Sequence, residues 1–270
     1  MLLRSLIVPL ILMLSLMSAA KAHSEVLCTL VSDAKTGAVL MEEGDCRSRV
    51  TPSSTFKIPL AIMAYDANIL ADAHHPVMSF RKGDPDWGIN WKHDTDPTNW
   101  LLYSVLWYSQ RITHAMGAQS LTRYAQDFGY GNADFSGDPG FDNGLERAWV
   151  ASSLKVSPHE QAIFLRALLI GTLPVRSSAM ERTREIVESR SLGSWTLHGK
   201  TGGAYPRRAD RSFDYARGWG WYVGWAVKGD RTLIFVRLTQ ARERTSGSPG
   251  VLTRDALFQD WPALVQRLDP

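Results

Sequence analysis

The sequence predicts an α+β fold, with one antiparallel sheet built from N- and C-terminal strands, flanked by helices, and a mainly helical middle region. Two observations predict it. Residues 26–46 and residues 195–240 are rich in strand-forming residues, and turn signals divide them into short runs. Residues 54–189, which lie between them, carry mostly helical patterns of apolar residues. Strands at both ends of a chain are typical of a single sheet to which both ends contribute.

The first 22 residues read as a secretory signal peptide. Arg4 precedes an apolar stretch, and Ala20, Lys21 and Ala22 close it with the small-residue pattern of a cleavage site. The apolar stretch is short for a membrane span. We therefore expect residues 1–22 to be removed, residues 23–270 to form a single catalytic domain, and the mature protein to be exported and free of the membrane.

The first predicted element of the mature chain is a β-hairpin. Two strand-like segments flank the turn signal at 33–37, and Cys28 and Cys46 fall near the open end of the hairpin. An exported protein meets oxidising conditions, which favours a disulfide between these cysteines. Two buried thiols and a pair of metal ligands remain the alternatives.

The middle and last parts of the chain divide into further elements. Residues 54–70 predict a central, buried helix, because their apolar residues are too dense for a surface stripe. Residues 74–98 have no clear periodicity. Further helices are expected at 104–117, 120–128, 158–171, 177–189 and 255–268, and strands at 196–202, 219–229 and 232–240.

Charge and histidine content argue against nucleic-acid and metal binding. The formal net charge is only +3, with both signs mixed along the chain. Arginine is concentrated at 207–217 and 237–254, and such a face favours a small anion over nucleic acid, because no nucleic-acid motif accompanies it. His74 and His75 lack further ligands at metal-binding spacing and read as part of a solvated loop.

Ser54 and Lys57 form the first candidate for chemistry. A lysine three residues after a serine lies on the same face of a helix, and serine is a poor nucleophile until a base takes its proton. An ordinary lysine is protonated at neutral pH, but burial among apolar groups such as Phe56, Leu106 and Trp149 lowers its pKa. The alternative is a helix start with a lysine that reaches solvent, which is common for this spacing alone.

Further motifs follow Ser54 in a specific order along the chain. They are STFK at Ser54, SVLW at Ser104, YGN at Tyr130, AWV around Trp149, KTG at Lys200, and the strand WYVGWAVK beyond it. With these motifs the chain resembles the class D serine β-lactamases, the oxacillinase type. The resemblance covers nearly all of the mature chain and implies a fold like that of serine β-lactamases and penicillin-binding transpeptidases.

The resemblance implies hydrolysis of β-lactam antibiotics through an acyl-serine intermediate on Ser54. Lys57 would react with carbon dioxide to give an N-carboxylated lysine, an anionic base that serves both acylation and deacylation. Trp149 would steady this base with its indole N–H, and Ser104 would relay a proton to the departing lactam nitrogen. No cofactor is implied apart from the carbon dioxide or bicarbonate that carboxylates Lys57.

The resemblance also assigns the substrate contacts. The KTG lysine and threonine would meet the substrate carboxylate together with an arginine near the last helix, for which Arg254 is preferred over Arg242 and Arg244. The backbone N–H groups of Ser54 and Gly203 would form the oxyanion hole. The expected substrate-binding residues are Lys200, Thr201, Gly202, Gly203 and Arg254.

Leu106 departs from the family pattern, which usually has valine there. This residue is expected to border the carboxylated Lys57, so a longer side chain affects how water or carbon dioxide reaches the lysine. The properties placed in doubt are the stability of the carbamate and the rate of deacylation.

Two other functions share this fold. A β-lactam sensor domain keeps the acyl group instead of releasing it and is usually tethered to a membrane, whereas this chain has only a cleavable signal. A penicillin-binding D,D-peptidase is disfavoured by the compact length and by the YGN and AWV motifs. The leading prediction is therefore a β-lactamase of the bacterial periplasm whose partner is a small-molecule β-lactam.

Overall fold

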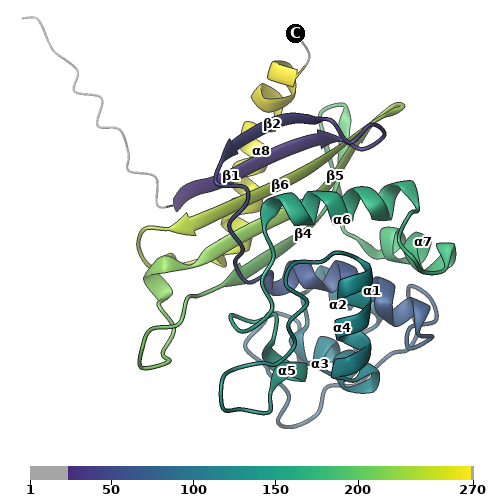
Figure 1. Cartoon of the computed structure of the whole chain (residues 1–270), viewed down its shortest axis with the longest axis vertical. Helices are drawn as coiled ribbons and strands as arrows, with labels where there is room; N and C mark the ends of the chain where they lie inside the picture. The colour runs from purple at the N-terminus through teal and green to yellow at the C-terminus, as the bar shows by residue number, and fades with distance from the viewer. Residues whose placement is uncertain (1–23, 269–270) are drawn as a thin grey trace, which may run out of the picture.

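A six-stranded antiparallel sheet forms the centre of the computed structural model, which describes residues 24–268 (Figure 1). The predicted signal peptide, residues 1–22, lies outside the described residues. The strand order is β2-β1-β6-β5-β4-β3, so the first strand pairs with the last one and the predicted joining of the two ends is confirmed. The strands are β1 (Ser24–Asp33), β2 (Val39–Gly44), β3 (Ser189–Leu192), β4 (Trp195–Ala204), β5 (Trp219–Lys228) and β6 (Arg231–Ala241).

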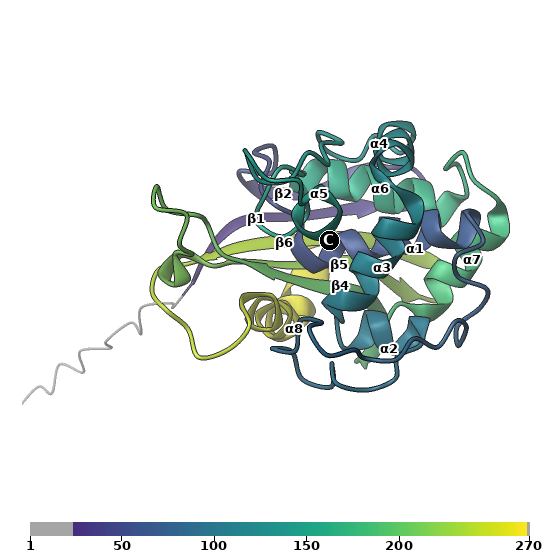
Figure 2. The same ribbon diagram turned by 90° about the horizontal axis from the view of Figure 1, so that it is seen from below.

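Helices cover both faces of this sheet. In Figure 2, α8 lies on one side of the strands and α6 lies on the opposite side. The helices are η1 (Ser53–Phe56), α1 (Lys57–Asp66), α2 (Pro97–Leu102), α3 (Leu106–Met116), α4 (Ala118–Asp127), α5 (Gly144–Arg147), α6 (Pro158–Ile170), α7 (Ser177–Ile186), η2 (Tyr215–Arg217) and α8 (Pro249–Leu268). The α+β prediction is thereby confirmed.

The alternation of side chains along the central strands explains this two-sided burial. Trp221 and Val223 of β5 join the core shared with the middle helices, whereas Tyr222, between them, packs with Trp261 of α8 on the other face. Successive residues of a strand point to opposite faces, so a strand that is apolar at every position needs cover on both sides. The run WGWYVGWAV is such a strand.

Several element boundaries differ from the predicted ones. The predicted helix over 54–70 is a 3-10 turn followed by an α-helix that ends at Asp66, and Asn68 then adopts a left-handed backbone conformation with φ 58°. The closing helix begins at Pro249 instead of residue 255, because proline suits the first turn of a helix. The short helix α2 begins at Pro97, at the end of a stretch without periodicity.

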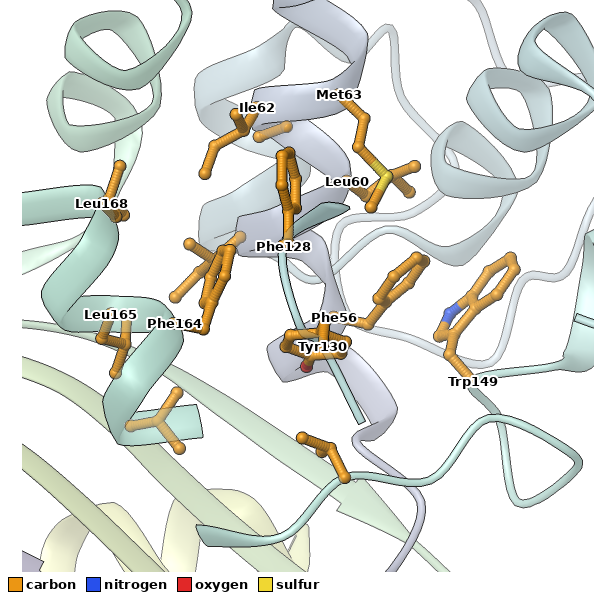
Figure 3. Close-up of a cluster of buried hydrophobic side chains, with 14 of the residues drawn as sticks. Phe56, Leu60, Ile62, Met63, Phe128, Tyr130, Trp149, Phe164, Leu165 and Leu168 are labelled. Carbon is orange, nitrogen blue, oxygen red and sulfur yellow. The ribbon is translucent and has the colours of Figure 1, made fainter. Parts of the chain in front are cut away.

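Helix α1 is the buried axis of the helical region. All nine residues from Lys57 to Tyr65 are buried, and Pro59 falls in the first turn, where a missing N–H costs no hydrogen bond. Figure 3 shows Phe56, at the start of this helix, surrounded by aromatic side chains that include Tyr130 and Trp149. The segment that carries Ser54 and Lys57 is thus anchored in close-packed core.

The two cysteines form a disulfide, as predicted. Cys28 of β1 is bonded to Cys46, which lies just past the end of β2, so the bond closes the open end of the hairpin. Among the described residues no helix is both long enough and apolar enough to cross a bilayer.

Replacing both cysteines, Cys28→Ser with Cys46→Ser, is expected to lower the free energy of unfolding by about 3 kcal/mol, since the bond closes a loop across a sequence separation of 18. Urea unfolding monitored by tryptophan fluorescence measures the change, and the wild-type protein in reductant is the matched control. Neither cysteine belongs to the predicted site around Ser54 and Lys57, so the remaining folded protein should keep whatever activity that site has. An unfolding midpoint that is the same in all three samples contradicts this role of the bond.

Candidate active site

Ser54 and Lys57 lie side by side at the junction of η1 and α1. The Nζ atom of Lys57 donates a hydrogen bond to Oγ of Ser54 at 3.3 Å. The spacing of three residues brings the two side chains to one face of the turn, as the sequence predicts. A nitrogen that contacts this hydroxyl can take its proton only when the lysine is neutral.

The surroundings of Lys57 favour the neutral amine. The side chain is only 1% exposed, although lysine is almost never fully buried without a charged partner. Burial in the core, and secondly the positive charge of Lys200, hold the pKa of Lys57 well below its ordinary value of 10.5. Lys57 is the first residue of α1 and a buried amine, so the alternative of a helix-start lysine that reaches solvent is wrong.

Trp149 and Leu106 form an apolar part of the wall of the cavity that Ser54 also lines. The indole ring of Trp149 lies 5.5 Å from the ring of Phe56, centroid to centroid, and Figure 3 shows the two rings beside each other. Thr51 fixes the tryptophan backbone: its Oγ1 donates to the carbonyl of Trp149 at 2.8 Å and accepts from the N–H of Ala151 at 3.0 Å. Leu106 lies at the first position of α3, is 7% exposed, and lines the same cavity as Trp149.

Ser104 occupies the turn between α2 and α3. Its backbone is in the left-handed region with φ 59°, and its Oγ is buried without a hydrogen-bond partner among the residues that the structure describes. Helix α3 starts at Leu106 instead of residue 104, with Val105 at the capping position, so Ser104 lies before the helix and does not cap it. A buried hydroxyl without a partner is costly, and such groups are concentrated at functional sites.

Strand β4 brings Lys200 next to the turn that carries Ser54. Lys200 is 5% exposed, and its Nζ donates to the carbonyl of Thr201 at 3.3 Å. Burial lowers the pKa of Lys200 to about 8, with a further decrease from Arg254 that opposes an increase from Glu188. The lysine is thus mainly charged below pH 8, although it is buried.

Close backbone contacts hold β4 against the turn around Ser54. A Cβ atom at Gly202 would lie 2.9 Å from the carbonyl oxygen of Pro52, so only glycine fits there. The hydroxyl of Ser53 donates to the carbonyl of Gly203 at 2.5 Å, with Ser53 itself in the left-handed region at φ 51°. This role of Ser53 was not predicted, because the two residues are far apart in the sequence.

Most of the predicted site residues meet at one cavity of about 510 Å³. Lys57, Lys200 and Gly202 do not line its wall; Lys57 and Lys200 are themselves buried. Arg254 of α8 lines it and pairs with Asp255, whereas Arg242 pairs with Glu25, so the sequence preference for Arg254 agrees with its position. The predicted residues that line the cavity are Ser54, Ser104, Leu106, Trp149, Thr201, Gly203 and Arg254.

One wall of the cavity was missed by the sequence interpretation. Trp87 and Ile89 are 71% and 85% exposed, and they lie on the irregular segment that lacks periodicity. Leu102 and Tyr103, at the end of α2, continue this wall. The pattern of alternate apolar residues in WGINW was the available signal, since exposed apolar side chains at a cavity favour contact with an apolar ligand.

The histidines predicted to be solvated do lie on an exposed loop. His74 and His75 contact Asp96 and Asp72, respectively, and all four side chains belong to the surface or its edge. Within residues 24–268, no group of three or more His, Cys, Asp or Glu side chains is arranged to hold a metal ion.

Comparisons with known proteins agree on one family. The sequence profile of the penicillin-binding protein transpeptidase domain matches residues 27–258. The β-lactamase OXA-9 of Klebsiella pneumoniae is 36% identical over 258 residues, which cover 93% of each chain. OXA-1 of Escherichia coli is 38% identical over 213 residues, 77% of this chain and 74% of that protein. The crystal structure of the class D β-lactamase OXA-427 is similar with a TM-score of 0.82 and 42% identity, covering 89% of this chain and 99% of that one.

Proposed function

Since the chain belongs to the class D β-lactamases, hydrolases that open β-lactam rings, we propose that Ser54 is its nucleophile and that carboxylated Lys57 is its general base. Class D β-lactamases need no metal or organic cofactor. The observation that carries the proposal is the buried Lys57 amine, whose pKa is lowered by burial and which contacts Oγ of Ser54 at 3.3 Å.

The environment of Lys57 fits carboxylation by carbon dioxide. A neutral amine adds to the carbon of carbon dioxide and loses one proton, which gives a lysine carbamate and one released proton. The carbamate supplies an anionic oxygen base that stays at the end of the lysine. Trp149 would donate its indole N–H to that base, because the ring is held against Phe56 and its backbone is fixed by Thr51.

The acylation step follows from the groups around Ser54. With its proton removed toward Lys57, Oγ attacks the lactam carbonyl carbon, and the C–N bond of the ring breaks. The backbone N–H groups of Ser54 and Gly203 would stabilise the oxyanion. Ser104 would relay the proton that Ser54 gave to the base: it accepts this proton from the base and donates its own to the leaving nitrogen, so that the base and the Ser104 hydroxyl both return to their starting forms. The buried hydroxyl of Ser104 supports this assignment, since a substrate nitrogen would be the polar partner that it lacks in the described residues.

Deacylation would use the same base to activate a water molecule. A water molecule near Lys57 loses a proton to the carbamate and attacks the acyl carbon. The ester bond to Ser54 then breaks, and the proton passes from the carbamate to Oγ of Ser54, which restores both groups. Leu106 borders this region in place of the usual valine, and its longer side chain is expected to limit the entry of water and carbon dioxide. We therefore propose that Leu106 sets the deacylation rate and the carbamate stability.

Charged groups at the other end of the cavity would bind the substrate carboxylate. Thr201 of β4 and Arg254 of α8 line the cavity from two different elements, and Lys200 is the buried neighbour of Thr201 on β4. Below pH 8 the Lys200 ammonium is available for this contact, which is stronger than a neutral hydrogen bond. The neighbouring apolar wall would face the rest of the substrate.

We also propose that residues 1–22 direct export and that residues 23–270 act as one catalytic domain in the periplasm of a bacterium. The signal-like N-terminal sequence and the disulfide between Cys28 and Cys46 support this location. Cell fractionation followed by mass determination of the mature N-terminus tests it.

Carbon dioxide should activate the purified enzyme. The mature protein is mixed with a chromogenic cephalosporin at pH 7 in degassed buffer, with and without added bicarbonate. Many turnovers per molecule, faster with bicarbonate, are expected, because the neutral Lys57 amine must be carboxylated before it acts as base. A single stoichiometric burst under both conditions would indicate a sensor or a slow peptidase, and equal steady-state rates would contradict the carbamate.

A further inference from the structure

A buried carboxylate with three arginines around it lies outside the active-site cavity. Asp138 is 8% exposed, and its Oδ2 lies 3.2 Å from Arg207, 3.6 Å from Arg147 and 3.7 Å from Arg211. Arginine and aspartate usually pair one to one, so this group, named here the Asp138 cluster, carries two positive charges in excess. Because the three guanidinium groups repel one another, the carboxylate of Asp138 is the group that holds them together.

Asp138 contacts the chain on both sides of Trp149. Arg147, two residues before the tryptophan, forms the ion pair described above. Ser152, three residues after it, donates from Oγ to Oδ1 of Asp138 at 2.8 Å. Between them Ala151 adopts a left-handed conformation with φ 56°, which is strained for a residue with a Cβ and needs support from its neighbours.

The other two arginines come from the hairpin that follows β4, residues 205–218. Arg207 lies four residues beyond Gly203, and its guanidinium lies 4.5 Å from the ring centroid of Phe213 in the same hairpin. Arg147 also approaches that ring, at 5.9 Å. The hairpin is therefore closed against the Trp149 segment by charge and by ring contacts together.

The placement of these contacts links two parts of the site. Arg147 and Ser152 flank Trp149 in the chain, and Trp149 is the proposed partner of the carbamate. Arg207 follows Gly203, a proposed oxyanion donor, by four residues. Without the carboxylate, Arg147, Arg207 and Arg211 would repel one another, and the hairpin would separate from the Trp149 segment. Asp138 itself does not line the active-site cavity, so it acts only through other residues.

We infer that Asp138 is a positioning residue, which holds the indole of Trp149 where it stabilises the Lys57 carbamate and so lowers the bicarbonate concentration that the enzyme needs. This inference rests on the proposed function, in which the carbamate is the general base. The chemical reason is that an indole N–H stabilises the carbamate only when its direction is fixed, and loss of that direction favours release of carbon dioxide.

The test is Asp138→Asn, which keeps the shape and removes the charge. The bicarbonate concentration that gives half-maximal turnover is expected to rise about tenfold, the factor that one lost oriented hydrogen bond produces. Saturating bicarbonate should restore most of the turnover number. Asp134→Asn is the matched control, because Asp134 lies on the same loop and its Oδ1 accepts only the local N–H of Ser136; its bicarbonate dependence should equal that of the wild type.

A second, milder variant keeps the inference testable if Asp138→Asn does not fold. Ser152→Ala removes one hydrogen bond to Asp138 and leaves all four charges in place, so a smaller shift in the same direction is expected. Carbon-13 NMR with labelled bicarbonate gives a readout besides activity: the carbamate signal of Asp138→Asn at limiting bicarbonate should be weaker than that of the wild type.

The outcomes separate this inference from the proposed function. If the wild type shows no carbamate signal and no response to bicarbonate, the proposed function fails. If the wild type responds but both variants have its bicarbonate dependence, with only a lower melting temperature, Asp138 is purely structural and the inference is overturned. A shift in Asp134→Asn as large as that in Asp138→Asn would also overturn it, because any charge on the loop would then suffice.

Discussion

Lys57→Met is expected to reduce steady-state β-lactam turnover by roughly 10³-fold or more, since it removes the proposed base for both chemical steps. Methionine has nearly the length of lysine and fills the same apolar space, so the fold around Ser54 should persist. Slow acylation should remain, because the oxyanion donors and the substrate contacts are unchanged. Mass spectrometry should therefore detect an acyl-enzyme that accumulates, while stopped-flow absorbance measures the lost turnover.

The same variant should be more stable than the wild type in buffer without bicarbonate. The side chain of Lys57 is charged in the unfolded protein, but burial favours its neutral form in the folded protein. Among the described residues, its Nζ hydrogen-bonds to Oγ of Ser54 and to no charged group. Replacement of such a buried amine by an apolar side chain is expected to raise the free energy of unfolding by about 2 kcal/mol.

The pH dependence of this stability difference has a definite sign. Between the folded pKa of Lys57 and 10.5 the unfolded wild type binds one more proton than the folded protein, so its stability rises with pH across that window. Lys57→Met should lack this contribution, and the two proteins should converge at high pH. Lys35→Met, at an exposed turn, is the control; a Lys57→Met protein that is inactive but no more stable would contradict the cost assigned to the buried amine.

The sequence could predict the features that depend on short spacings. The contact between Ser54 and Lys57 follows from their spacing of three residues in a helical turn. The disulfide follows from a hairpin whose two cysteines lie near its open end. The sheet was also predictable, because the apolar runs of β5 and β6 are long and separated by a clear turn. These patterns are local, so they can be recognised in the sequence without knowledge of the fold.

Features that join distant segments could not be predicted in this way. The bond from Ser53 to Gly203 spans 150 residues, and the contact of Asp138 with Arg207 spans 69. Neither has a periodic pattern, and the arginines of 207–217 suggested only a basic face. The turn at Ser104 was read as the start of a helix, because a serine before an apolar run also fits a cap, and only the fold reveals its left-handed backbone.

Lys200→Met is expected to lower kcat/KM for penicillins about 10²-fold at pH 7, because a hydrogen bond from a charged group to the substrate carboxylate is lost. The more discriminating result is the pH profile. In the wild type, Lys57 must be neutral and Lys200 must be charged, so kcat/KM should fall on the acidic side through the pKa of Lys57 and on the alkaline side near pH 8.

Removing Lys200 should change both limbs of that profile in a predictable direction. The alkaline limb near pH 8 should disappear, because the group that loses its proton there is gone. The acidic limb should move to higher pH, because the positive charge of Lys200 helps to lower the pKa of Lys57. Rates are measured at one fixed, limiting concentration of dissolved carbon dioxide, so that the acidic limb reports the competition between protonation and carboxylation of the Lys57 amine.

Lys228→Met, at the exposed end of β5, provides the control and should retain both limbs. A Lys200→Met enzyme that keeps the alkaline limb would mean that another group binds the substrate carboxylate, and Arg254 would then be the residue to change. An acidic limb that stays in place would mean that burial alone keeps Lys57 neutral. The two limbs thus separate the role of Lys200 in substrate binding from its effect on the base, because each depends on a different lysine in the same buried pair.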